Sequence, residues 1–105
     1  LEEIVKFALE NNLAFDNLGT IVVQSIAGAI ATGTHGSGVT HGSLDQSILA
    51  FTVITANGTI KTFDKELDVE KFNTAVVGLG ALGIVSNVKI SSYLQFKNHH
   101  QIAFF

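Results

Sequence analysis

Ser47-Ile-Leu-Ala-Phe-Thr-Val-Ile-Thr-Ala-Asn-Gly-Thr-Ile-Lys-Thr-Phe63 is the segment with the clearest secondary-structure signal of the chain. Residues 47–56 are rich in β-branched side chains, and residues 59–63 take up a similar pattern after Asn57-Gly58. An Asn-Gly pair between two such runs is a strong signal for a two-residue type I′ turn, because both residues tolerate a positive φ. The sequence therefore predicts an antiparallel β-hairpin over residues 47–63.

Helical patterns lie on both sides of this hairpin. Apolar residues recur at helical spacing near the N-terminus, and Asn11-Asn12 can end that helix because Asn tolerates the left-handed conformation. Asp68 can cap a second helix, whose expected inner face is Val69, Phe72, Ala75 and Val76. An alternating strand is expected over residues 84–93. This order of elements favours an α+β fold, with a mostly antiparallel sheet flanked by helices, over a doubly wound fold.

Composition excludes several classes of protein. The 105 residues suffice for one small domain, and with 47% apolar and 14% charged residues the chain is expected to fold. The net charge of −3, with no basic stripe, argues against nucleic acid as a partner. No apolar run reaches the roughly 18–20 residues of a transmembrane helix. The chain has no methionine, starts inside a helical pattern and ends on the apolar run 101–105, so it is expected to be a fragment.

Residues 25–43 form the unusual segment of the chain, with five of the ten glycines interspersed with hydroxyl residues and two histidines. Ser25 is a good N-cap for a short helix of small residues over 26–31. Small side chains let a ligand approach the backbone, and a helix start with free N–H groups suits a pyrophosphate. A structural loop packed under the hairpin explains the same residues equally well.

Two other motifs give weaker evidence for a binding site. Gly78-x-Gly80-x-x-Gly83 fits the dinucleotide fingerprint, but strand-forming residues follow it where that motif requires a helix. A tight turn is therefore expected there instead of a nucleotide site. His35, His41 and Asp45 are possible metal ligands by type, but their spacing matches no helix or hairpin ligand pattern, so no metal site is predicted.

Four stretches together resemble the FAD-binding domain of PCMH-type flavoproteins, the vanillyl-alcohol-oxidase superfamily. They are Asn17-Leu-Gly-Thr20, Gln24-Ser-Ile-Ala-Gly-Ala-Ile-Ala-Thr-Gly-Thr-His-Gly-Ser-Gly38, Val53-Ile-Thr-Ala-Asn-Gly58 and Gly78-Leu-Gly-Ala-Leu-Gly-Ile-Val85. Within that superfamily they are most similar to the aldonolactone oxidases, which act on gulono-, galactono- or arabinono-1,4-lactone. The resemblance covers residues 1–93. It implies the second subdomain of the FAD-binding domain, with residues 94–105 starting the connection to a substrate domain.

The resemblance also implies site residues. By motif position the expected FAD contacts are Thr20, Ser25, Gly28, Ala29, Ile30, Ala31 and Thr32. His35 and Gly36 would lie close by, and Ile84 or Val85 would meet the adenine through backbone groups. Thr20 occupies a position where some relatives carry a hydroxyl facing the flavin ring, so contact with substrate is expected there as well.

What the resemblance implies for the parent protein is an FAD-dependent oxidase. It would oxidise a secondary alcohol of a sugar-1,4-lactone and pass the electrons to oxygen, giving peroxide, or to another acceptor. The chain lacks the family's histidine-bearing first subdomain and its substrate domain, so the fragment is expected to pack against both and to be inactive alone. An alditol or polyol oxidase of the same superfamily, and a non-catalytic binding domain that keeps the glycine-rich turn, are the alternatives. The compartment stays open between the cytoplasm and a membrane surface, as do covalent flavin attachment and oligomeric state.

Overall fold

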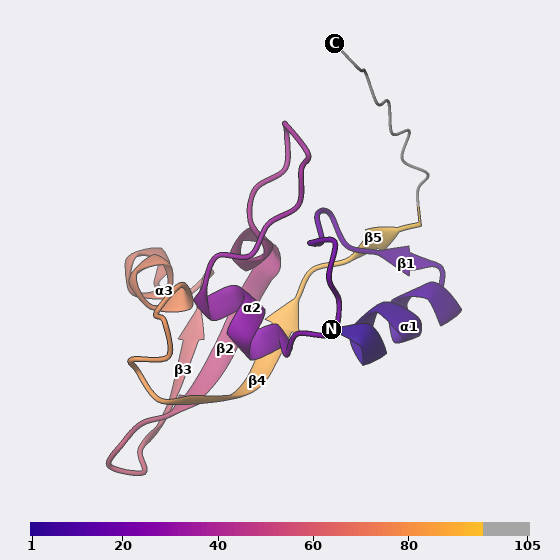
Figure 1. Cartoon of the computed structure of the whole chain (residues 1–105). Coiled ribbons are helices and arrows are strands. Elements are labelled where there is room, and N and C mark those ends of the chain that lie inside the picture. Colours follow the sequence, from indigo (N-terminus) through magenta and orange to yellow (C-terminus); the bar gives the residue numbers. More distant parts are fainter. Residues whose placement is uncertain (96–105) are drawn as a thin grey trace.

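A three-stranded antiparallel sheet forms the centre of the molecule. In the computed structural model, which describes residues 1–95, strand β2 (Ile48–Ile54) lies between β3 (Ile60–Asp64) and β4 (Ile84–Ile90), as Figure 1 shows. Both neighbours of β2 are antiparallel to it, and two irregularities interrupt its register with β4. With helices packed against this sheet, the predicted α+β class is confirmed.

The hairpin is confirmed, but its turn is of another type. Of the residues between β2 and β3, only Gly58 has a positive φ, +81°, whereas a type I′ turn needs one at Asn57 as well. The Thr55 N–H donates to the Thr59 carbonyl at 2.9 Å, and the Gly58 N–H donates to the Thr55 carbonyl at 2.8 Å. This pattern is that of a three-residue loop, a type I turn followed by a left-handed glycine. The Asn57 side chain accepts from the Thr59 N–H and from the Thr55 hydroxyl, which secures the loop from within.

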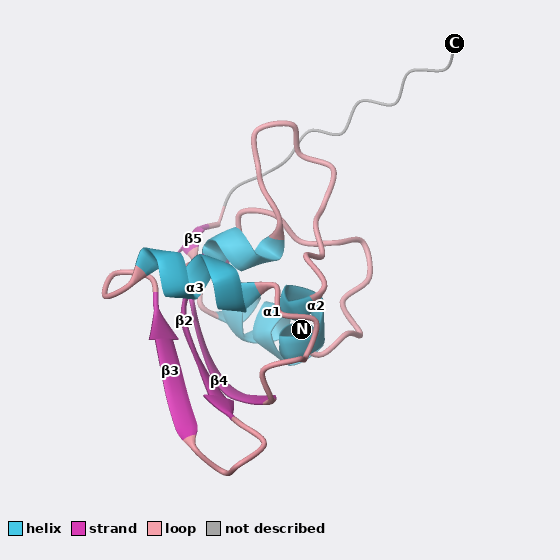
Figure 2. Cartoon of the chain, turned by 90° about the vertical axis from the view of Figure 1, so that its left-hand side faces the viewer, coloured by secondary structure: helices cyan, strands magenta, loops and turns pink. Residues whose placement is uncertain are grey.

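Helices α2 (Ile26–Ala31) and α3 (Val69–Val76) cover one face of the sheet (Figure 2). Phe51 on β2 stacks on Phe63 of β3, with ring centroids 5.0 Å apart, and meets the edge of Phe72 of α3 at 5.6 Å. The buried side chains of this single core come from both helices, β2 and the 3-10 turn η1 (Leu44–Ser47): Ala29, Ile30, Leu44, Ile48, Phe51, Val53, Phe72, Ala75 and Val76. The predicted inner face of α3 is correct except for Val69, which is 51% exposed.

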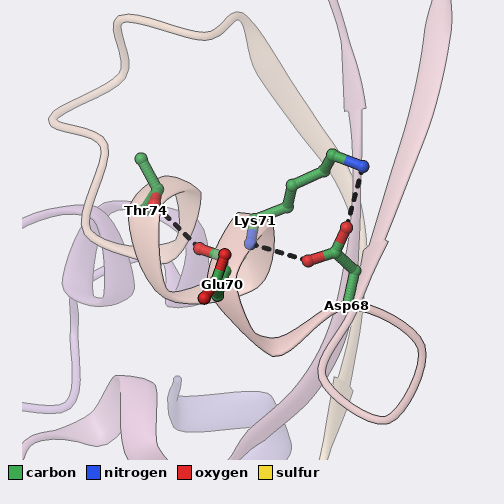
Figure 3. A network of polar contacts seen from close by, with 4 residues as sticks. All are labelled: Asp68, Glu70, Lys71 and Thr74. Atoms are coloured by element: carbon green, nitrogen blue, oxygen red, sulfur yellow. Dashed lines mark hydrogen bonds and ion pairs between the residues drawn. The ribbon is translucent and has the colours of Figure 1, made fainter.

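Asp68 starts α3, as predicted. Its carboxylate accepts from the Lys71 backbone N–H at 3.0 Å and pairs with the Lys71 ammonium at 2.8 Å (Figure 3). The ammonium and then the backbone N–H of Lys71 lower the pKa of Asp68, and the carboxylate in turn raises the pKa of Lys71. One turn later the Thr74 hydroxyl donates to the Glu70 carbonyl at 2.8 Å (Figure 3). Local capping therefore fixes where this helix begins.

A smaller unit stands beside the sheet, made of helix α1 (Glu2–Glu10) and the two-stranded ladder of β1 (Leu13–Ala14) with β5 (Tyr93–Leu94) (Figure 1). Asn12 follows α1 with a φ of +54°, as its predicted role at the helix end requires. The strand predicted over residues 84–93 is in fact divided into β4 and β5. Of the α1 residues only Ala8 is buried; on the same apolar stripe Ile4 and Val5 are half-buried and Leu9 is exposed.

Candidate functional site

Helix α2 is built as its sequence predicts. The Ser25 hydroxyl accepts the Gly28 N–H at 3.0 Å, so Ser25 is the N-cap. Ala29 and Ile30 are buried in the core and anchor the helix, while Gly28 lies on its exposed side. A Cβ on Gly28 would meet only the Ser25 Oγ, at 3.2 Å. The backbone of α2 is thus fixed on one side and open to a ligand on the other.

The cap changes which backbone donors are free. Ser25 binds the N–H of Gly28 through its side chain and that of Ala29 through its carbonyl, at 3.0 Å each. At this end of α2 the amides left for a ligand are therefore at most those of Ile26 and Ala27. The hydroxyl of Thr32 donates to the Gly28 carbonyl at 3.0 Å, so it is not a free donor either. Fewer backbone N–H groups are therefore free at the start of α2 than the sequence predicted.

Beyond α2 the chain rises as a long loop before it reaches η1 (Figure 1). The loop leaves α2 through Gly33, whose φ of +64° redirects the backbone. The Thr34 carbonyl accepts the Leu44 N–H at 2.8 Å, which closes the base of the loop. His35 is exposed, and its Nδ1 lies 2.8 Å from the Gly36 carbonyl. The predicted contact residues His35 and Gly36 therefore sit where the loop leaves its closed base.

The loop and the segment before α2 enclose a polar pocket. Thr20 and Gly36, both predicted FAD contacts, are among its lining residues. Asp16 and His41 also line this pocket, and their side chains pair at 2.8 Å between Oδ1 and Nδ1. Two segments that are separated in the sequence are thus joined around one polar space.

A second, apolar pocket lies beside α2. The Leu79 N–H donates to the Ala31 carbonyl at 3.1 Å and ties the turn at 78–83 to the end of α2. Ala31 and Val85, both predicted contacts, line the same pocket. Its other lining residues are mostly small or apolar: Ala27, Ile30, Phe51, Val53, Ala75, Val76, Gly78, Gly80, Leu82 and Gly83. The neighbouring Ile84 is 73% exposed. Of the predicted site residues, Thr20 and Gly36 line the polar pocket, and Ile30, Ala31 and Val85 line the apolar one. The remaining six line neither pocket: Ser25, Gly28, Ala29, Thr32, His35 and Ile84.

The three candidate metal ligands do not assemble. Within residues 1–95 no three histidine or acidic side chains gather as a metal site would require. His41 pairs with Asp16 and not with Asp45, whose Oδ1 is buried without a hydrogen-bond partner in the described part of the chain. Sequence reasoning had not singled out Asp16 or Asn17 as site residues. The signal for Asn17 was its place at the start of the Asn-Leu-Gly-Thr motif.

These residues suit a ligand that has a diphosphate and a flat aromatic end. Between residues 17 and 44 there is no acidic side chain to repel a phosphate, while serine, threonine and glycine are frequent. The exposed Gly28 leaves the backbone of α2 accessible, and the apolar pocket beside Ala31 offers a surface without charge.

Of the helices that the structure describes in residues 1–95, none has the length and apolar character needed to cross a membrane.

Comparison with known proteins fits this geometry: the sequence model of a family described as FAD binding domain matches residues 1–64. The chain belongs to this family, and FAD is the cofactor that such a domain binds. Among its relatives are proteins named D-arabinono-1,4-lactone oxidase, from Debaryomyces hansenii (36% identical over 84% of this chain) and Yarrowia lipolytica (36% over 99%). The L-gulonolactone oxidase of Bos taurus is 38% identical over 83% of the chain. The chain spans only 16%, 20% and 20% of the length of these three relatives.

Proposed function

We propose that this chain is the second subdomain of the FAD-binding domain of an oxidase that acts on a sugar-1,4-lactone. In this proposal residues 1–93 belong to the subdomain, and residues 94–105 start the connection to a substrate domain. Most of that connection lies outside the described residues; Leu94 itself pairs with Leu13 in the small ladder. The observation that carries the proposal is the segment 25–38, which has no charged carboxylate or ammonium group and is exposed at Gly28 and along its loop, in a chain that matches lactone oxidases over most of its length.

In the proposed complex FAD lies extended along α2 and the loop that follows it. Gly28 lets the diphosphate approach the helix, and the N–H groups of Ile26 and Ala27 are the donors that the cap leaves free. The adenine end meets the backbone of Ile84 and Val85, next to the apolar pocket that Val85 shares with Ala31. The flavin end lies toward the polar pocket, where Thr20 is an exposed hydroxyl.

The chemistry supplied by bound FAD is acceptance of a hydride from the secondary alcohol carbon at flavin N5, with electrons passing on to oxygen or another acceptor. The residues of this chain bind and orient. Thr20 would place its hydroxyl between the flavin ring and the substrate, while His35 and Gly36 would support the loop beside it. Among the described residues that line the pocket around Thr20, the ionisable ones are Asp16 and His41, and they pair with each other. The proposal therefore assigns removal of the substrate's proton to residues of the parent protein outside these pocket-lining residues.

A substrate panel on the full-length parent protein tests this proposal. We expect the purified protein to show a flavin absorption spectrum, and D-arabinono-1,4-lactone or L-gulono-1,4-lactone to bleach it under anaerobic conditions. A protein that xylitol bleaches and the lactones do not would be an alditol oxidase. A colourless protein whose melting temperature FAD does not raise would be a binding or structural domain, and the proposal would then be wrong.

A further inference from the structure

The side chain of Asn17 contacts both ends of the loop that bears Gly36. Its amide nitrogen donates to the Gly42 carbonyl at 3.0 Å, across 25 positions of sequence, in a partly buried place. Its carbonyl oxygen lies against Gly36, so close that a Cβ built on Gly36 would overlap it and would come within 2.7 Å of the Leu18 carbonyl oxygen. One small side chain thus holds the loop over residues 36–42 at its beginning and at its end.

This contact bears on the polar pocket because Asn17 lies three residues before Thr20. Thr20 and Gly36 line the same pocket from two different segments, residues 15–20 and residues 36–41. Asn17 belongs to the first segment and donates a hydrogen bond to Gly42, directly after the second. Gly19 adds a close approach on the same side, since a Cβ there would meet Thr34 Cγ2 at 3.3 Å. The separation of Thr20 from Gly36 is therefore set by packing around Asn17.

The second link between the segments is weaker. The Asp16 and His41 side chains pair at 2.8 Å but remain 38% and 39% exposed, and exposed pairs of this kind contribute little to stability. The Asn17 amide is less accessible to water, so its bond to Gly42 faces less competition. The hydrogen bond of Asn17 is thus the stronger of these two links between the segments.

We infer that Asn17 is a positioning residue that fixes the loop at 36–42 against Thr20 and so sets the width of the flavin end of the FAD site. The inference rests on the proposed function, because it takes Thr20 and Gly36 as FAD contacts. Both halves of the amide are needed: the N–H for Gly42, and a carbonyl small enough to lie on the Cα of Gly36. Aspartate has the same shape but would set an oxygen against the Gly42 carbonyl.

The test compares Asn17→Asp with Ser91→Ala in the full-length, FAD-loaded parent protein. Ser91 is a matched control, because its hydroxyl also makes one partly buried bond to a distant carbonyl, that of Ser47 at 3.0 Å, and it lines neither pocket. We expect both variants to lower the melting temperature, Asn17→Asp by more, because the Ser47 carbonyl still accepts the Ser91 N–H at 2.8 Å after Ser91→Ala. Only Asn17→Asp should raise the Kd for FAD, by about tenfold, and change the flavin absorption and fluorescence, because FAD would then have to order the loosened loop on binding, at a cost of roughly one hydrogen bond.

The outcomes separate this inference from the proposed function. Should Asn17→Asp prevent folding, Gly36→Ala attacks the same contact from the loop side and is expected to give the same loss of FAD affinity and the same spectral change. An unchanged Kd and flavin spectrum in Asn17→Asp or its substitute Gly36→Ala, or an equal loss in Ser91→Ala, would overturn the positioning role while the proposed function stands. A wild-type protein that binds no FAD would overturn both.

Discussion

Two glycine-rich segments of this molecule look alike in sequence and differ in what their glycines do. Gly83, in the turn before β4, has a φ of +135°, and a Cβ built on it would overlap the Ile54 carbonyl. Gly28, in α2, is exposed, has an ordinary helical backbone, and would bring its Cβ only to the Ser25 hydroxyl. At Gly83 the absence of a side chain allows close packing against Ile54, and at Gly28 it leaves the helix surface open. For these two glycines, the atoms that a Cβ would meet distinguish the structural one from the one whose surface is open, whereas the glycine content of the two segments does not.

The largest effect on stability is expected from Gly83→Ala. Backbone strain at a positive φ costs about 1–3 kcal/mol and forced overpacking about 1–3 kcal/mol, so we expect a loss of at least ~3 kcal/mol in the free energy of unfolding. Because Gly83 is pressed on the last residue of β2, the pairing of β2 with β4 should be lost first. Denaturant unfolding monitored by circular dichroism measures this. A variant with wild-type stability would show that the close approach of these two strands is not required.

Gly28→Val should produce the opposite behaviour. The added atoms lie on the exposed side of α2, where the diphosphate is proposed to approach, so we expect the Kd for FAD to rise by roughly 100-fold, the equivalent of about 2.7 kcal/mol. Stability should change by only about 1 kcal/mol, the usual value of an N-cap, because the new Cβ crowds the Ser25 hydroxyl.

Ser25→Ala is the control for Gly28→Val, because it removes the cap bond without adding atoms toward the ligand. Titration of the purified apoprotein with FAD, followed by flavin fluorescence, measures both variants. If Ser25→Ala loses as much FAD affinity as Gly28→Val, the Ser25 hydroxyl, as a cap or as an FAD contact, and not the open backbone at Gly28 explains the effect.

Gly80→Ala measures the cost of a positive φ in the same turn without steric overlap. Gly80 has a φ of +78°, but a Cβ there would meet nothing within 4 Å. Only the left-handed backbone opposes a side chain, so we expect a loss of about 1 kcal/mol in unfolding free energy, well below that of Gly83→Ala. The same denaturant experiment compares the two. Equal losses in both variants would mean that steric contact adds nothing at Gly83.

The smallest effect is expected at Asp68, outside both glycine segments. Asp68→Asn keeps an N-cap acceptor but removes the charge that pairs with Lys71. The pKa of Asp68 is lowered in the folded protein, so its ionised form stabilises the fold above the unfolded-state pKa, and this contribution is lost as the pH falls through the lowered value. Wild type should thus be slightly more stable than Asp68→Asn near neutral pH, and the two should converge in acid. Urea midpoints across that range measure the difference, and a gap that widens in acid would contradict the assignment.

Much of the fold was readable from local signals. The Asn57-Gly58 pair, the Asp68 cap and the Ser25 cap each depend on a residue and its near neighbours, and all three mark the positions that they predicted. The turn type was wrong because Asn-Gly fits two loop geometries, and the choice depends on the pairing of Thr55 with Thr59. Likewise, the end of β4 is set by contacts between distant strands that no local pattern encodes.

The candidate site was only partly predictable. Its residues came from a motif, and the motif could not say which donors the protein itself uses, such as the Gly28 amide and the Thr32 hydroxyl. The role inferred for Asn17 was also hidden, because it depends on a contact with Gly42 across the pocket. Such long-range contacts follow from the path of the loop, which a single sequence does not specify.

Hydrogen–deuterium exchange of the parent protein with and without saturating FAD shows directly whether FAD lies along α2 and the loop that follows it. If the open backbone of α2 and its loop receives the diphosphate, FAD should slow exchange across residues 25–38 and leave the hairpin tip at 55–60 unchanged. Exchange at 25–38 that stays the same while FAD is demonstrably bound would contradict the account, since the ligand would then lie elsewhere.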